Sequence, residues 1–214
     1  MKANYSRFAA PLALASAVQY LIVANLVIFV LELLGPINRM FLEFGLMPYK
    51  VVYQGAIWQL VTGMFLHGGY MHIGINLLVL WFIGPPVERV WGMKRFFIYY
   101  FVSGIGANLI VILLALTVVP EMMYVVTIGA SGAIYGVLLA FGLLFPEQMV
   151  YLYFLFPIKA KYFVILAAAF AFFSEAGNLT PGINNWAHLG GMLFGLVYLK
   201  GRGWLRQLSG RLGG

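Results

Sequence analysis

The chain has 214 residues, of which 63% are hydrophobic and only 9% are charged. Soluble globular domains have about 45–50% apolar and about 25% charged residues. So few charges cannot cover a water-exposed surface of this size, which excludes an ordinary soluble domain. The composition therefore predicts a polytopic membrane protein that is largely covered by a lipid bilayer.

Cys and Asp are both absent, and the six acidic residues are all Glu. Without Cys there is no thiolate nucleophile and no cysteine-based metal site. Without Asp there is neither an aspartyl intramembrane protease nor a Ser-His-Asp triad. A histidine base must therefore be one of three side chains: His67, His72 or His188.

Apolar runs separated by Gly, Pro and charged residues predict an all-α fold with six membrane-spanning helices. The expected helices are 17–34, 71–86, 96–119, 129–145, 158–173 and 186–199. Several are shorter than the roughly 20 residues of a full crossing, so some begin below the membrane surface, where a water-filled cavity can form. We expect a domain over 17–200, preceded by a cytoplasmic segment (1–16, not a signal peptide) and followed by a basic cytoplasmic tail (201–214).

The connection from about 35 to 70 is unusually long for a loop. It contains few charges and several aromatic residues, among them Tyr53, Trp58 and Phe65. Aromatic side chains favour the membrane interface, so we expect a structured outer loop that is partly immersed there.

The basic residues orient the chain in the membrane. With the N-terminus inside, eleven of the 13 Lys and Arg residues fall in inner segments, and only Arg39 and Lys50 fall in outer ones. This bias predicts that both termini are cytoplasmic. The net charge of +7 follows from the bias and from contact of the tail with anionic lipid, so no nucleic-acid partner is expected. The short N-terminal segment without a transit peptide indicates the plasma membrane of a prokaryote.

In this orientation three polar residues lie at a similar depth on the outer side, each at the start of a helix. His72 begins the second helix, Ser131 the fourth and His188 the sixth. Polar groups inside a membrane bundle are costly and are candidates for function by default.

Ser131 lies in the sequence Gly129-Ala130-Ser131-Gly132. It is either a small residue that lets helices pack or a nucleophile that a base activates. The glycines permit close backbone approach, and the free N–H groups of a helix N-terminus suit a developing oxyanion.

His188 is either a structural histidine or the base for Ser131. Small residues at four-residue spacing let helix backbones approach closely, and two such stripes favour contact between the fourth and sixth helices. The stripes are Gly132, Gly136 and Ala140 on the fourth helix and Ala187, Gly191 and Gly195 on the sixth. Tyr135, one turn after Ser131, is expected to pack on the imidazole ring.

His72 and Asn76 share one helix face and offer hydrogen-bond donors, either for an oxyanion hole or to hold helices together. His67 lies off that face, and we interpret it as a structural residue of the loop. Glu88 and Arg89, at the inner end of the second helix, suit a capping or ion-pair role. The remaining acids are expected near the interfaces.

Other chemistries fit less well. A zinc protease would need a His-Glu-x-x-His motif, which is absent; a three-histidine metal site would have no carboxylate beside it. We therefore expect no metal and no cofactor. A Ser-Lys dyad would need a lysine near Ser131, but Lys159 and Lys161 fall on the inner side. A transporter is the alternative from another class; it would need polar residues toward the inner side, where 137–144 and 193–199 are apolar.

Taken in order, these motifs resemble the rhomboid family of intramembrane serine proteases. The matching stretches are Trp58-Gln59, Phe65-Leu66-His67 with His72-x-x-x-Asn76, Gly129-Ala130-Ser131-Gly132 with Tyr135, and Ala187-His188-x-x-Gly191. The family often has arginine at the position of Gln59. The resemblance covers roughly residues 20 to 200.

The resemblance implies a basic bacterial form with six helices that cleaves transmembrane protein substrates near their outer ends. It implies Ser131 as nucleophile and His188 as general base, with His72, Asn76 and the Ser131 N–H in the oxyanion hole and Tyr135 supporting His188. It also implies that the fifth helix and the loop at about 174–185 gate substrate entry from the lipid. A non-proteolytic binding protein with the same fold is a further alternative.

Overall fold

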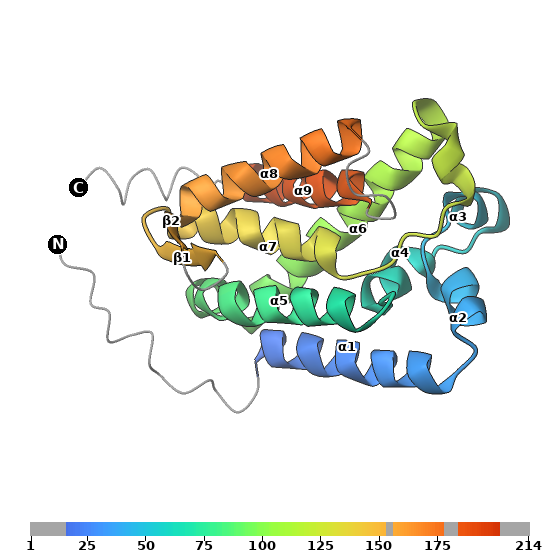
Figure 1. Ribbon diagram of the computed structural model, residues 1–214, viewed down its shortest axis with the longest axis horizontal. Helices are drawn as coiled ribbons and strands as arrows, with labels where there is room; N and C mark the ends of the chain where they lie inside the picture. The colour runs from blue at the N-terminus through green and yellow to red at the C-terminus, as the bar shows by residue number, and fades with distance from the viewer. Residues whose placement is uncertain (1–15, 153–155, 178–183, 202–214) are drawn as a thin grey trace.

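The computed structural model describes residues 16–152, 156–177 and 184–201, which form a mostly helical protein (Figure 1). The elements in chain order are α1 (Ala17–Leu34), α2 (Ile37–Phe44), α3 (Pro48–Gln54), α4 (Gln59–Thr62), η2 (Gly63–Phe65), α5 (Tyr70–Trp91), α6 (Met93–Thr117), η3 (Pro120–Tyr124), α7 (Ser131–Leu144), β1 (Met149–Leu152), β2 (Phe156–Lys159), α8 (Ala160–Ala176) and α9 (Asn185–Gly201).

A helix lies at each of the six places where the sequence predicts one. Helices α1, α5 and α6 are long and apolar enough to cross a bilayer, and α7 is a shorter apolar helix. The outward faces of the three long helices remain apolar, as expected for a chain that meets lipid: Val30 on α1, Phe82 on α5 and Leu113 on α6 are exposed. In lipid every backbone polar group needs an internal partner, so spanning segments of this composition fold as helices. The chain is a multi-pass membrane protein.

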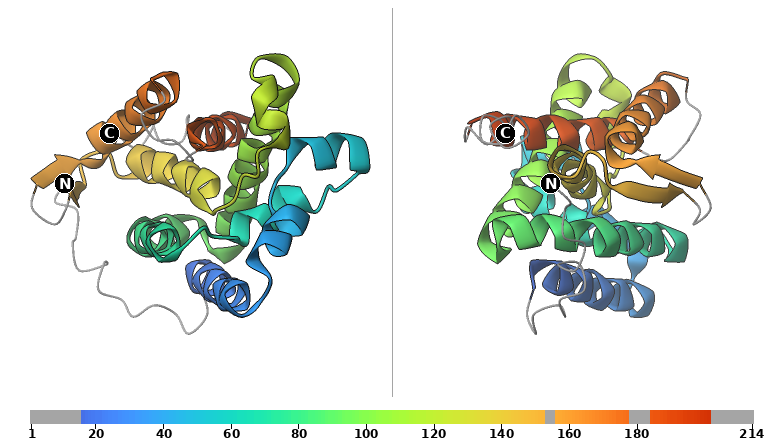
Figure 2. Two further views of the ribbon diagram at one scale, coloured as in Figure 1. Left: turned by 45° about the vertical axis from the view of Figure 1, so that its right-hand side comes forward. Right: turned by 90° about the vertical axis from the view of Figure 1, so that its left-hand side faces the viewer.

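Helix α7 is the centre of the bundle. It packs against α5, α6, α8 and α9, which surround it in the end-on view of Figure 2. Nine of its 14 residues are buried, among them Val137, Leu138 and Phe141. Helices α5, α7 and α9 start at the same end of the bundle, the end where α2, α3 and α4 lie (Figure 1).

The predicted close approach of the fourth and sixth helices is confirmed. A Cβ atom built on Gly191 of α9 would overlap the carbonyl oxygen of Gly132 on α7. One turn further, Gly136 has no room for a Cβ because Ser103 of α6 fills that space. Only glycine lets these backbones touch, and such contacts drive helix association in lipid, where burial of apolar surface contributes little.

Helix α1 is held at its N-terminus by two side chains. Ser16 Oγ accepts a hydrogen bond from Gln19 N (3.1 Å), and the Glu88 carboxylate accepts bonds from Ala17 N (2.7 Å) and Val18 N (3.1 Å). Glu88 on α5 therefore satisfies N–H groups that a helix start leaves without partners. This confirms the predicted capping role of Glu88.

Two expectations about the fold are wrong. The fold is not all-α, because β1 and β2 pair as an antiparallel hairpin with Met149 opposite Lys159. At the base of the hairpin the Glu147 carboxylate pairs with Lys159 Nζ (2.6 Å) and with Lys161. Hydrogen bonds from these two lysines lower the pKa of Glu147 to about 2, so it is ionised at neutral pH.

The second expected helix does not end at residue 86 but continues through Pro85 and Pro86 to Trp91. The prolines remove two N–H donors, yet the following turn is fixed by buried Val87 and by the bonds of Glu88 to α1. Gly92, at φ 77°, then ends the helix.

Candidate active site

Ser131 is the first residue of α7, and its position depends on Gly129. Gly129 has φ 118°, a conformation that residues with a side chain rarely adopt. A Cβ at Gly129 would also lie 2.6 Å from His72 Nε2. Gly129 therefore turns the chain into α7 and lets His72 lie directly against the backbone that leads to Ser131.

His188 and Ser131 are joined by a hydrogen bond although 57 residues separate them in the chain. His188 Nε2 lies 2.8 Å from Ser131 Oγ. His188 is buried on α9, three residues after the start of that helix. Gly132 follows Ser131 directly and Gly191 lies three residues after His188, so the close contact of α7 and α9 at these glycines brings the two side chains together.

The imidazole ring of His188 is oriented by stacking. The ring of Tyr135 lies parallel to it, with centroids 4.2 Å apart and an interplanar angle of 3°. The other ring nitrogen, His188 Nδ1, is buried and accepts or donates no hydrogen bond within the described residues. Among the described residues, stacking on Tyr135 therefore orients the ring without a carboxylate at Nδ1.

His72 and Asn76 of α5 face the same region. Asn76 Nδ2 donates to the His72 carbonyl oxygen (3.0 Å), which leaves one amide N–H free for another partner. The Gly129 Cβ position would lie 3.9 Å from this Nδ2 and 2.6 Å from His72 Nε2. The structure therefore brings all the predicted site residues together: Ser131, His188, His72, Asn76, Tyr135, Gly129 and Gly132.

These residues line a cavity of about 1070 Å³. Most of the α8 lining is apolar and includes Phe163, Leu166 and Phe170, while Ser174 and Glu175 line the cavity near the end of that helix. Helices α5, α7 and α9 contribute further polar groups. The cavity therefore combines a hydrophobic surface with a small number of converging polar groups, the usual composition of a binding site.

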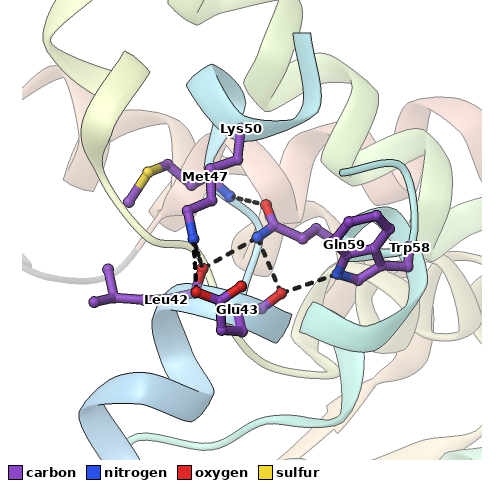
Figure 3. Close-up of polar contacts among 6 residues, drawn as sticks. All are labelled: Leu42, Glu43, Met47, Lys50, Trp58 and Gln59. Atoms are coloured by element: carbon purple, nitrogen blue, oxygen red, sulfur yellow. Dashed lines mark hydrogen bonds and ion pairs between the residues drawn. The ribbon is translucent and has the colours of Figure 1, made fainter. Parts of the chain in front are cut away.

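Side-chain hydrogen bonds join separate segments of the loop between α1 and α5, as the close-up in Figure 3 shows. Gln59 Oε1 accepts from Met47 N (3.0 Å), and Gln59 Nε2 donates to the carbonyl oxygens of Leu42 and Glu43 (both 3.2 Å). Trp58 Nε1 also donates to Glu43 O (2.9 Å). Trp58 and Gln59 thus tie α4 to α2, which confirms that the loop is structured.

This loop supports the segment that leads to Ser131. Leu46 forms a two-way backbone bridge with Thr127, and Gly129 N donates to Gly63 O (2.9 Å). Thr127 Oγ1 in turn accepts from Asn184 Nδ2 (2.9 Å), just before α9. The segments before Ser131 and before His188 are therefore joined to each other and to the loop.

Comparison with known proteins identifies the family of the chain. A family profile described as "Rhomboid domain" matches residues 54–203, which is more than half of the chain. The chain belongs to the rhomboid family.

Named rhomboid relatives are similar over most of this chain. It is 34% identical to RHOMBOID-like protein 4 of Arabidopsis thaliana over 185 residues, which cover 83% of this chain and 44% of that protein. It is 32% identical over 172 residues to Rhomboid protease GluP of Bacillus subtilis (strain 168), covering 79% of this chain and 31% of the relative. The chain thus spans less than half the length of these two relatives.

The burial of Glu32, which precedes the residues matched by the rhomboid profile, was not predicted from the sequence. We expected the acids outside the second helix to lie near the interfaces; Glu32 lies two residues before the end of α1, but it is only 1% exposed. Its carboxylate oxygens accept from the backbone N–H of His67, at 3.0 and 3.3 Å. The only signal in the sequence was an acid near the end of an apolar helix, which does not distinguish an interface residue from a buried one.

His67 is a structural residue of the rhomboid loop, as its position off the His72 face predicts. Its side chain is fully buried, its Nδ1 lies 3.1 Å from Phe65 O, and its ring contacts that of His72 edge-on at 5.0 Å. Burial, together with the neighbouring His72 ring, lowers the pKa of His67 to about 4, so the imidazole is neutral at pH 7. The expected gate at about 174–185 lies partly outside the described residues, because 178–183 are not among them.

Proposed function

We propose that this rhomboid protein is an intramembrane serine protease with a Ser131–His188 dyad. The observation that carries the proposal is the distance of 2.8 Å between His188 Nε2 and Ser131 Oγ. A serine becomes a nucleophile when a base within hydrogen-bond reach takes its proton, and His188 is in that position. The name of the Bacillus subtilis relative, a rhomboid protease, supports the same activity.

The proposed reaction has two halves, formation of an acyl-enzyme on Ser131 and its hydrolysis, and His188 transfers protons in both. His188 Nε2 takes the hydroxyl proton as Ser131 Oγ attacks the carbonyl carbon of the scissile peptide. His188 then gives that proton to the leaving amine, and an acyl-enzyme forms. Water, activated by the same nitrogen, releases the acid product and restores Ser131.

The oxyanion that forms on attack needs donors that are already in place. His72 Nε2, the second N–H of Asn76 Nδ2 and the backbone N–H at Ser131 are the proposed donors. The N–H groups of the first helical turn have no partner within the helix, and the positive end of the helix dipole adds to their effect. Preorganised donors of this kind lower the barrier most where water is excluded.

The substrate class follows from where the dyad lies. Helix α7 has 14 residues, or about 21 Å at about 1.5 Å per residue, whereas the hydrocarbon core is about 30 Å thick. Ser131 at its start would therefore lie below the outer membrane surface. We propose that substrates are transmembrane proteins whose segment unwinds near its outer end, because freed backbone groups must find partners in the cavity.

The positive-inside bias supports six spans with both termini cytoplasmic and the cavity open to the outer side. Helices α8 and α9, with 17 residues each, complete that topology. The proposed catalytic unit is the expected domain at 17–200, while a prokaryotic plasma membrane stays a prediction from the sequence.

The cavity does not support a transporter. Its lining on α7 ends at Leu138, and on α9 it ends at His188. Buried apolar residues, including Phe141 and Leu199, fill the inner part of the bundle. On α8 the lining runs from Phe163 to Glu175, but its inner part, at Phe163, Leu166 and Phe170, is apolar. The polar lining thus stops part-way through the bundle, which favours a site for chemistry over a polar pathway.

A cleavage assay tests the proposal. Purified protein in detergent is mixed with a fluorescently tagged single-pass membrane protein, and wild type and Ser131→Ala are compared. Wild type should produce two fragments, and Ser131→Ala should be at least about a thousandfold slower, the range lost when a catalytic group is removed. Full activity of Ser131→Ala, or an inactive wild type of normal thermal stability, would contradict the proposal.

A further inference from the structure

Glu32 is a buried acid on a membrane helix, and its carboxylate faces the loop that precedes His72. It lies two residues before the end of α1 and is 1% exposed. Ionisable groups at such sites are expensive, so one that is present usually has a function. The contact made by its carboxylate is to the backbone N–H of His67.

The next peptide group after this contact reaches the site. Gly68 N donates a hydrogen bond to His72 Nδ1 at 3.3 Å. A backbone N–H only donates, so His72 Nδ1 must act as the acceptor and carry no proton. In a neutral imidazole the proton is then on Nε2. Nε2 is the atom that lies against Gly129, toward Ser131.

We propose that Glu32 is a positioning residue for His72. Its carboxylate holds the backbone N–H of His67 and so fixes the turn at His67 and Gly68. In that turn the Gly68 N–H donates to His72 Nδ1. This selects the His72 tautomer that carries its proton on Nε2, where it can donate to the oxyanion. The proposal rests on the proposed protease function and adds to it a residue that touches neither substrate nor the dyad. The edge-on contact between the His67 and His72 rings is a second, side-chain contact between this turn and His72.

The protein contains its own control for a purely structural role. Glu88 is also a buried glutamate that accepts backbone N–H groups and also acts on α1, but at the opposite end, at Ala17 and Val18. Neither glutamate lines the site cavity, but Glu88 lies near the end of α5, whereas His72 lies near its start. Loss of Glu88 should lower the stability of the protein and leave the position of His72 unchanged. Loss of Glu32 should lower stability and also displace His72 in the proposed oxyanion hole.

The test measures kcat, KM and thermal midpoints for Glu32→Met, Glu32→Gln and Glu88→Met in the cleavage assay, at a temperature where all are folded. Methionine fills the space without accepting the N–H bond, and glutamine keeps an acceptor oxygen. Glu32→Met should lower kcat by about tenfold to a hundredfold, the range for a misplaced catalytic group, with KM unchanged. Glu32→Gln should restore most of kcat, and Glu88→Met should lower only the midpoint.

A double-mutant cycle separates positioning from general weakening. If Glu32 acts through His72, Glu32→Met should cost nothing further in a His72→Ala background, whereas independent effects would multiply. Multiplied effects, or a wild-type kcat in Glu32→Met, would overturn the proposal. An inactive wild type would instead overturn the protease function itself, so the two failures are distinguishable.

One measurement needs no variant of Glu32. Nitrogen-15 NMR of protein labelled at histidine reports which ring nitrogen carries the proton, and the His72 signal is assigned by its loss in His72→Ala. The proposal expects a proton on Nε2 of His72. A proton on Nδ1 in the folded wild type would overturn it even if Glu32→Met does not fold.

Discussion

The ring of Tyr135 lies flat on the ring of His188, with centroids 4.2 Å apart. Tyr135 is one turn after Ser131 on α7, so a single helix supplies both the hydroxyl that meets His188 Nε2 and the surface that fixes its ring plane. If His188 is the base that we propose, these two contacts to one helix take the place of the orienting carboxylate, which a chain without any Asp lacks.

The oxyanion donors should act on the rate and not on the fold. His72→Ala and Asn76→Ala each remove one proposed donor while leaving Ser131 and His188 in contact. Loss of one such donor costs about 10²–10³ in kcat. The check is kcat of each variant at saturating substrate, with fluorophosphonate labelling as a control that Ser131 is still present. Wild-type kcat in both variants would remove His72 and Asn76 from the oxyanion hole.

Gly129→Ala should abolish cleavage. The substitution forces a side chain into φ 118° and places its Cβ 2.6 Å from His72 Nε2. A strained backbone of this kind costs about 1–3 kcal/mol, and the overlap must also displace His72. The measurement is cleavage activity together with the thermal midpoint, which should both fall. Wild-type values for both would show that the turn into α7 adapts freely.

A methyl group added between α7 and α9 should also lower both stability and activity. Gly191→Ala would bring a Cβ into the Gly132 carbonyl, separate the two helices and so lengthen the Ser131–His188 distance. We expect a loss of about 1–3 kcal/mol of stability, typical of overpacking, and at least tenfold lower activity. Gly74→Ala is the matched control, because a Cβ on this α5 glycine meets nothing within 4 Å. Equal behaviour of the two variants would contradict this account of the packing.

His67 should make the folded protein sensitive to acid. Its pKa falls from 6.5 to about 4 on burial, so the unfolded chain binds more protons between these values. Stability from this residue is therefore complete above pH 6.5 and is lost as the pH falls toward 4. His67→Gln keeps a donor for Phe65 O but does not titrate, so its thermal midpoint should fall less over this range. Identical pH dependence in wild type and variant would show that His67 is not responsible.

The sequence predicted the site better than its surroundings. Ser131, His188, His72 and Asn76 are polar residues at helix starts within apolar runs, and such residues stand out because lipid tolerates few of them. Small-residue stripes predicted which helices touch. These signals are local, and the polar residues they mark meet in the folded chain.

The parts that the sequence did not reveal depend on long-range contacts. The hairpin of β1 and β2 contains Pro157 and short apolar strands, a pattern that does not separate strand from helix. Helix α5 continues beyond Pro85 and Pro86, where Glu88 bonds to the start of α1, at least 70 residues earlier in the chain. Glu32 and His67, which share a hydrogen bond, are 35 residues apart, and no sequence pattern within α1 predicts this bond.

In the proposed reaction Ser131 is a nucleophile that His188 activates. The most direct test is labelling of the purified protein with a fluorophosphonate probe, followed by mass spectrometry of the modified peptide. We expect one modification, on Ser131, in wild type and in Gly74→Ala, and none in Ser131→Ala or in folded His188→Ala. Modification of another residue, or undiminished labelling of His188→Ala, would contradict this mechanism.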